Sequence, residues 1–466
     1  MPLHQFDYLF VIGTLFAYLN AWNIGANDVA NAWASAVASL SISYLGAMLL
    51  AAVMEFSGAV LAGTGVTDTI RNGIFDTAQF EGKPPLLMLG MSTHTLIGGL
   101  IGFGIAALGT GAIKWVSNEP GATAISSGVV QVFLSWIIAP CLAGVFAALV
   151  FTIPKFTVLL RNRPELKGLF LFPVYFAITS ALISMLLLSK GGTIKVPDEQ
   201  VPVAVVTVGL GLGALVGIFL VPWLYRTVIL NDWQLKWYDM WKGLFLLHRG
   251  PDMIWWAVKF TVLYGVDKDV VNLQAKGEDA LSTNVNDMHA RAVQYDKKAE
   301  HLFKFLQVLM SATASFAHGA NDVSNAIGPY TTVFQIWKDG NIGADSEVPT
   351  WILVTSGLGI VIGLWTYGYN IMKNLGNKLT LLSPSRGFCI DVGSATTVIL
   401  ATKLGLPVST TQCITGATVG VGLCNGDWRS INWRMIAFIY SGWFLTLPVT
   451  ATVLGALMGF IINAPQ

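Results

Sequence analysis

The chain has 466 residues, of which 54% are hydrophobic and 11% are charged, and its formal net charge is +1. A soluble globular chain carries about 25% charged residues, and here the few charges lie between long apolar runs, which is typical of an integral membrane protein. The balanced charge and the lack of a Lys/Arg-rich run argue against nucleic acid as a partner.

Several apolar runs are long enough to cross the ~30 Å hydrocarbon core of a bilayer as helices. The first run is expected to be a mature helix, because no basic region precedes it and no cleavage site follows it. Two polar, small-residue-rich stretches, 25–39 and 319–337, directly follow spans and are expected to be half-helices or re-entrant segments. The candidate spans are 6–24, 44–66, 85–109, 126–152, 169–188, 202–222, 302–318, 350–372, 387–404, 405–424 and 433–462.

Loop charges predict the orientation of the spans, since short cytoplasmic loops retain Lys and Arg. Loops 153–168 and 373–386 are rich in basic residues and are expected inside, whereas the acidic loop 338–349 is expected outside. The long polar stretch 223–301 is predicted to be a cytoplasmic loop. It divides the chain into two membrane repeats, the first copy (1–222) and the second copy (302–466).

An octapeptide occurs in both copies, as Gly25-Ala-Asn-Asp-Val-Ala-Asn-Ala32 and as Gly319-Ala-Asn-Asp-Val-Ser-Asn-Ala326. A weaker echo aligns Ser92-Thr93-His94 with Thr410-Thr411-Gln412, followed by glycines at matching intervals. The loops that follow spans 44–66 and 350–372 differ in charge, so the two copies are predicted to have inverted orientations, as in transporter repeats.

The first copy is expected to lack one helix. Its region 85–125 must cross the membrane an even number of times if 67–84 is outside and 153–168 inside, yet it holds one apolar run where the second copy has two. We infer that a helix and a Pro-Val-Ser turn are missing directly before Ser92. The predicted fold is therefore an all-α integral membrane protein of about 11–12 transmembrane or re-entrant helices in two inverted repeats.

Each octapeptide carries an aspartate in apolar surroundings, at a cost of roughly 2.5–3.5 kcal/mol in a membrane helix. One such motif alone would be explained as a helix N-cap. Two symmetric copies favour a cation site, because carboxylate and amide oxygens suit sodium and the Asn-Asp-x-x-Asn spacing places ligands on one helix face. The candidate residues are Asn27, Asp28, Asn31, Asn321, Asp322 and Asn325.

Ser409, Thr410 and Thr411 follow Pro407, a residue favoured near a helix start. Hydroxyls and free backbone N–H groups at the positive end of a helix form an anion site. The alternative is that these hydroxyls bond the backbone of a packed helix. In the first copy, Ser92 and Thr93 are the corresponding candidates, without the preceding proline.

Other residues have open roles. Glu55 and Asp391 are intramembrane acids, either way-stations for a proton or cation or groups hydrogen-bonded between helices. His318 stands where the first copy has Ile24, so the repeat gives it no required role. The four cysteines are interpreted as packing residues.

Together these motifs resemble the inorganic phosphate transporter (PiT) family, and the likeness is closest to its fungal sodium/phosphate symporters. It rests on the paired octapeptides, on Leu406-Pro-Val-Ser-Thr-Thr411, and on the runs Gly368-Tyr-Asn-Ile-Met-Lys-Asn-Leu-Gly-Asn377 and Ser383-Pro-Ser-Arg-Gly-Phe388. The likeness spans nearly the whole chain. The helix and turn missing before Ser92 are present in the family, and the central loop is shorter here than in close relatives.

The resemblance implies a non-enzymatic secondary transporter that imports inorganic phosphate by symport with sodium and uses no organic cofactor. It implies phosphate bound by Asn27, Asn321, Ser409, Thr410, Thr411, Ser92 and Thr93, sodium bound by Asp28, Asn31, Asp322 and Asn325, and coupling roles for Glu55 and Asp391. Further expected partners are membrane lipid and, in a homodimer, a second copy of the chain. The expected location is the plasma membrane.

Alternative functions remain. A proton could replace sodium as the coupling ion, and sulfate or arsenate could replace phosphate. An intramembrane aspartyl protease would also use two aspartates sharing a proton, but it does not need the repeated asparagines or the Ser-Thr-Thr turn. The missing helix allows a non-transporting truncated isoform, or a variant produced by the gene model.

Overall fold

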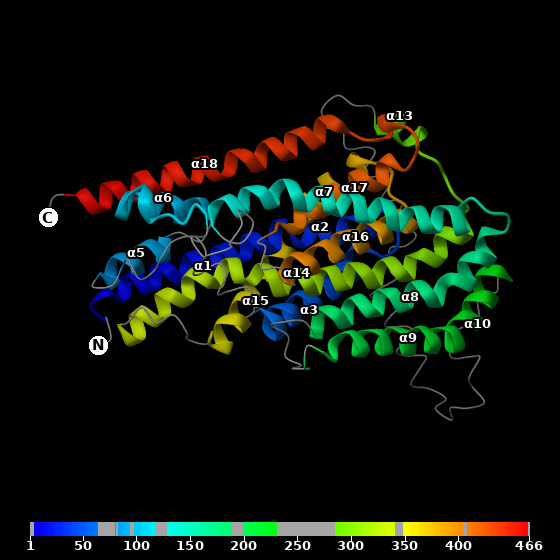
Figure 1. Cartoon of the computed structure of the whole chain (residues 1–466), viewed down its shortest axis with the longest axis horizontal. Helices are drawn as coiled ribbons and strands as arrows, with labels where there is room; N and C mark the ends of the chain where they lie inside the picture. The colour runs from blue at the N-terminus through cyan, green and yellow to red at the C-terminus, as the bar shows by residue number, and fades with distance from the viewer. Residues whose placement is uncertain are drawn as a thin grey trace.

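The structure is a computed structural model that describes residues 4–63, 80, 83–93, 97–116, 128–188, 197, 199–230, 285–340, 348–403 and 408–464. Across these residues it is helical apart from turns and an isolated bridge between Thr380 and Ile431. The helices lie side by side along the long axis of the molecule, with both termini at one end (Figure 1).

Seven helical segments in the described ranges are long and apolar enough to cross a membrane. The 43-residue α14 is as long as any of them, but it carries too many polar side chains to meet the same criterion. The seven candidates lie in α1 (Asp7–Asn27) continued by α2 (Val29–Ala38), α3 (Tyr44–Ala62), α7 (Val129–Pro154), α8 (Pro164–Leu188), α9 (Val201–Phe219), α15 (Thr350–Leu379) and α18 (Trp433–Asn463), and α14 covers Lys297–Asp339.

The remaining helices are shorter. They are α5 (Pro84–Thr93), α6 (Ile97–Leu108), α10 (Val221–Leu224), α13 (Val285–Ala290), α16 (Pro384–Lys403) and α17 (Thr410–Leu423). Figure 1 places α5 and α6 at the end of the molecule that holds the termini, and α10 at the opposite end.

The two octapeptides lie inside long helical segments, so the expectation of half-helices or re-entrant segments at 25–39 and 319–337 was wrong. The whole second stretch lies within α14. In the first stretch, Asp28 separates α1 from α2, but its backbone stays in the helical region and its N–H still bonds the carbonyl of Ile24 at 2.9 Å. The small residues of these motifs therefore allow close packing of helices and do not end them.

Runs 387–404 and 405–424 do not form two crossings. At their base, the Nε and Nη2 atoms of Arg386 donate to Oδ1 of Asn425 at 3.0 and 2.9 Å, so α16 begins where α17 ends. At their tip, Thr410 reaches Asp322, near the middle of α14. The 14-residue α17 spans only about 21 Å, which is too short for a bilayer. The pair, termed here the second hairpin, enters from one end and returns to it.

The base of the second hairpin is fixed to the start of α14. Both carboxylate oxygens of Glu300 accept hydrogen bonds from Ser385, one from the backbone N–H at 2.8 Å and one from the hydroxyl at 2.7 Å. The Arg386 guanidinium lies over the Tyr295 ring, 5.0 Å from its centroid. These contacts satisfy the buried charges and hold the tip of the hairpin at a defined depth.

The structure divides the predicted span 85–109 between α5 and α6, so this run is not one continuous helix. The two helices correspond to α16 and α17 and are termed here the first hairpin. A pair that turns back, as the second hairpin does, makes zero crossings, which agrees with the loop charges. The helix inferred to be missing before Ser92 stays a prediction. The difference between the copies is one of length, because α5 has 10 residues and α16 has 20.

The duplication reappears as matching contacts between the two halves. The octapeptide alignment makes Trp22 equivalent to Phe316. Gly58 of α3 packs against the carbonyl of Phe316, and Gly363 of α15 packs against that of Trp22, each so closely that a Cβ would collide with it. Each motif helix therefore pairs with the following helix of the other half.

Helices α1 and α14 run antiparallel. Phe10 stacks on Trp337 with ring centroids 4.4 Å apart, the Thr14 hydroxyl donates to the Tyr330 hydroxyl at 3.0 Å, and further along the helices Asn20 bonds the Asn325 carbonyl. The two copies of the octapeptide consequently approach the same region from opposite directions.

The second hairpin packs on α7 through glycine. A Cβ at Gly416 would collide with the carbonyl of Pro140, so Gly416→Leu is expected to cost about 1–3 kcal/mol of stability through overpacking. We expect a lower melting temperature for the detergent-purified protein. The matched control is Gly459→Leu on α18, where a Cβ would meet nothing within 4 Å. Equal melting temperatures for the two variants would contradict this packing.

Candidate ion and anion site

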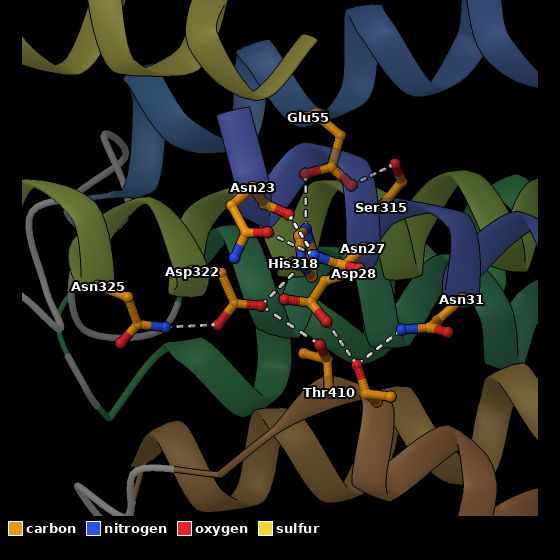
Figure 2. A network of polar contacts seen from close by, with 11 residues as sticks. Asn23, Asn27, Asp28, Asn31, Glu55, Ser315, His318, Asp322, Asn325 and Thr410 are labelled. Carbon is orange, nitrogen blue, oxygen red and sulfur yellow. Dashed lines mark hydrogen bonds and ion pairs between the residues drawn. The ribbon is translucent and has the colours of Figure 1, made fainter. Parts of the chain in front are cut away.

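Near the middle of α14, polar side chains from α1, α2, α3, α14 and α17 converge between apolar helices (Figure 2). The second hairpin brings its Thr-Thr tip to this point, and the antiparallel α1 and α14 bring the two Asn-Asp motifs. The site therefore joins the predicted cation motif and the predicted anion turn.

Asp322 is bound on both of its oxygens. Oδ2 accepts a hydrogen bond from the Thr410 hydroxyl at 3.2 Å, and Oδ1 accepts one from the Asn325 side chain at 3.1 Å (Figure 2). Asp322 and Asn325 are neighbours on one face of α14, as their spacing predicts.

Asp28 has the corresponding contact with the next residue of the tip. The Thr411 hydroxyl donates to Oδ1 of Asp28 at 2.6 Å and accepts a hydrogen bond from the Asn31 side chain, also at 2.6 Å. A single turn of the second copy thus contacts the aspartates of both copies.

His318 bridges two acids at the centre of the site. Its Nδ1 lies 2.7 Å from Oε2 of Glu55 and its Nε2 lies 2.8 Å from Oδ2 of Asp322, although the second contact lacks the angle of a hydrogen bond. Glu55 also accepts a hydrogen bond from the Ser315 hydroxyl at 2.6 Å. His318 is a functional candidate that repeat symmetry missed.

The site has an excess of negative charge. Three carboxyl groups, Glu55, Asp28 and Asp322, face one imidazole, which can supply a single positive charge at most. Ligand atoms of Asp28, His318 and Asp322 lie within 4.8 Å of one another. Since buried charge in a membrane protein is costly unless it is balanced, the arrangement suits a bound cation.

The geometry does not support the simpler explanations of these motifs. Asp28 precedes α2, but its side chain makes no cap hydrogen bond, and Asp322 lies in the interior of α14. The hydroxyls of Thr410 and Thr411 donate to carboxylates and not to the backbone.

Three candidates keep side-chain groups that the aspartates do not use. Asn27 is half-buried and donates to Oδ1 of Asn23 at 2.7 Å. Ser409 is the N-cap residue of α17, but its side chain makes no cap bond. Within the described part of the chain, the half-buried side chain of Asn321 makes no hydrogen bond. These groups are available to a ligand.

Asp391 lies outside this cluster. It accepts hydrogen bonds from the Ser311 hydroxyl at 2.6 Å and from the Ser35 hydroxyl at 3.1 Å. Ser311, Ser315 and His318 recur on one face of α14, so Asp391 and Glu55 are attached to the same helix at successive turns.

Ser92 is not brought to the site. It lies near the start of α1 and the end of α14, next to Gly13 and Val333, and its hydroxyl donates to the backbone carbonyl of Leu89. Val333 is roughly 16 Å along α14 from Asp322. Thr93 ends α5, and its side chain lies outside the described part of the structure. The first hairpin therefore supplies no hydroxyl from Ser92 to the site.

Comparison with known proteins identifies the family. The model of the phosphate transporter family matches residues 24–92 and 91–454. The chain belongs to the phosphate transporter family. The family is one of transporters, not enzymes. The two matched segments meet at 91–92, which is the junction where the first hairpin is short.

Relatives cover nearly all of the chain. It is 44% identical to the phosphate-repressible phosphate permease of Neurospora crassa, over 100% of this chain and 99% of that protein. That alignment extends over 591 positions, so it opens gaps in the 466-residue chain. The chain is 30% identical to the chloroplastic inorganic phosphate transporter 2-1 of Arabidopsis thaliana, over 94% of this chain and 70% of that protein.

A solved structure has the same fold. It is described as the sodium-dependent phosphate transporter and matches 98% of this chain and all of its own, with a TM-score of 0.71 and 27% identity. The predictions of an all-α membrane fold and of membership in the phosphate transporter family are confirmed.

Proposed function

We propose that the site binds inorganic phosphate together with sodium, which is the binding step of a sodium-coupled phosphate importer. The observation that carries the proposal is the contact of Thr410 and Thr411 with Asp322 and Asp28. The hydroxyls suited to binding an anion therefore lie within hydrogen-bond distance of the carboxylates suited to binding a cation.

This adjacency couples the two ligands. Phosphate cannot settle beside Asp28 and Asp322 while both carboxylates are uncompensated, because like charges repel strongly in a low-dielectric site. Sodium bound to these oxygens removes the repulsion and releases the threonine hydroxyls to the phosphate. In return, bound phosphate favours sodium, since coupling between ligands is reciprocal.

The positions of the basic loops support one orientation in the membrane. The turn between α7 and α8, which carries Arg161 and Arg163, lies at the same end of the molecule as the start of α14 (Figure 1). We assign this end to the cytoplasm, together with the 223–301 loop, and place the protein in the plasma membrane. Each net positive charge that enters the cell with phosphate then gains about 2.3 kcal/mol per 100 mV of membrane potential.

His318 supports a second candidate, coupling to protons. The imidazole lies between Glu55 and Asp322 and can carry a proton in the position where a cation would balance them. The two mechanisms differ in their response to sodium.

The test is radiolabelled phosphate binding to the purified protein, with sodium replaced by choline or lithium and with pH varied independently. Sodium coupling predicts that choline lowers phosphate affinity by more than roughly tenfold at constant pH. A phosphate affinity that does not depend on sodium but changes with pH would favour proton coupling. Binding of sulfate in place of phosphate would overturn the choice of anion.

The double variant Ser409→Ala/Thr410→Ala is expected to lower phosphate affinity by more than roughly tenfold, about 1.4 kcal/mol or above, because it removes two hydroxyl donors at the start of α17. Ser92→Ala is the matched control, since Ser92 bonds the backbone far from the site. Equilibrium binding of labelled phosphate measures both. A double variant with unchanged affinity would show that the tip residues only pack.

A further inference from the structure

The two hairpins cover their motif helices unequally. In the second copy, α16 lies along α14: Gly387 contacts the side chain of Gln307, and Asp391 accepts a hydrogen bond from Ser311. Further along, Ala317 lines one pocket together with Ala395 of α16. The second hairpin therefore covers α14 as far as the site.

The octapeptide alignment gives the equivalent positions on α1. Gln307 corresponds to Gly13, where Ser92 at the end of α5 makes contact. The first hairpin thus covers α1 where the second hairpin has only begun to cover α14. Beyond Gly13, α1 continues for about four turns before Asp28.

Exposure shows the consequence. Leu19 is 60% exposed, whereas its equivalent Thr313 is 1% exposed. Asn23 is exposed, whereas its equivalent Ala317 is 4% exposed. One turn beyond Asn23 lies Asn27, which donates to it and is itself half-buried.

Lipid is a poor neighbour for this surface. Asn23 lies close to the level of Asp322, because Asn20 bonds the carbonyl of Asn325. This is near the middle of α14, where lipid chains offer an amide no hydrogen-bond partner. The side chain of Asn27 already donates to Oδ1 of Asn23, and water can satisfy the amide groups of the two residues that remain.

We propose that a water-filled opening along α1 connects the Asp28 side of the site permanently with the face of the molecule that carries the chain termini. The opening passes Leu19 and Asn23. It admits sodium and phosphate to the site from that face without any movement of the second hairpin. The proposal rests on the proposed function for the identity of the ligands, but not for the existence of the opening.

Cysteine accessibility tests the opening. In a Cys141→Ser background, which removes an exposed thiol, Asn23→Cys is treated in intact cells with a membrane-impermeant, positively charged thiosulfonate. We expect modification at least ~10-fold faster than for Ala317→Cys, since thiol reactivity needs water and access. Leu19→Cys is a second reporter, because Leu19 makes no polar contact at the site. Sodium with phosphate, added together, is expected to slow modification of Asn23→Cys.

Each outcome decides a separate point. An Asn23→Cys protein that is present in the membrane but reacts only after denaturation, with Leu19→Cys behaving alike, would overturn the opening. Modification only in inside-out vesicles would overturn its direction. Equal rates for Asn23→Cys and Ala317→Cys would overturn the unequal covering. Fast modification that sodium and phosphate leave unchanged would support the opening and count against the proposed ligands.

Discussion

Asp322→Asn is expected to abolish sodium-dependent phosphate binding by the purified protein. The change keeps the shape of the side chain but removes the charge that faces His318 and accepts from Thr410. Without that charge the cation loses a ligand, so phosphate affinity in sodium should fall by well over tenfold, more than ~1.4 kcal/mol. Labelled phosphate binding at several sodium concentrations measures the loss.

The matched control is Asp339→Asn, an exposed acid at the end of the same helix, which should bind as the unmodified chain does. Asp28→Asn is expected to give the same loss as Asp322→Asn, because Asp28 meets Thr411 as Asp322 meets Thr410. If both site variants bound phosphate in sodium normally while folding and reaching the membrane, the cation assignment would be wrong.

Lengthening the first hairpin is expected to turn binding into transport. Translocation requires that the site be closed on each side of the membrane in turn. In the 466-residue chain only the second hairpin brings its tip to the site. We therefore expect little phosphate uptake from this chain. A form with a helix and a Pro-Val-Ser turn restored before Ser92 is expected to accumulate phosphate.

Uptake of labelled phosphate by the two forms, side by side at equal membrane levels, is the measurement. An insertion of the same length with alanine in place of the turn residues controls for length alone. Sequencing the transcript across codons 91 and 92 shows which form the cell makes. If the 466-residue chain took up phosphate as fast as the lengthened form, the requirement for two full-length hairpins would be contradicted.

Much of the site could be predicted from the sequence because one of its motifs is duplicated. Asp28 and Asp322 stood out through the repeated octapeptide, and Thr410 with Thr411 through the turn before a helix start. Such local patterns report which residues share a helix face. The hydrogen bonds from Thr410 and Thr411 to the two aspartates were not predicted, because they join segments far apart in the sequence.

Other residues of the site could not be found from the internal repeat. His318 has no counterpart in the first copy, so the repeat gave no reason to select it, although it lies four residues before Asp322 and hence on the same face of α14. Ser315 and Ser311, which donate to Glu55 and Asp391, both lie on α14, and no repeated motif marked them in the sequence. Departures from a repeat merit as much attention as agreements.

Hydropathy alone also failed to predict how far the helices α16 and α17 extend across the membrane. The runs that form α16 and α17 are apolar enough to be taken for crossings, but hydropathy does not tell a helix that traverses the bilayer from one that turns back within it. Contacts in the structure show that the two ends of this hairpin lie together, among them the hydrogen bond from Arg386 to Asn425 and the bridge between Thr380 and Ile431.

The exchange of partners between the halves affects how the protein is made. Helix α1 packs along α15, with Gly25 against the backbone of Ile360, so its main partner is synthesised more than 300 residues later. At about 5–20 residues per second, α1 waits roughly 20 to 70 s in the membrane for α15, and Asp28 waits longer still for the hydroxyl of Thr411. A ribosome that stalls before Thr411 leaves Asp28 without this partner, so such a fragment should be recognised as misfolded and degraded.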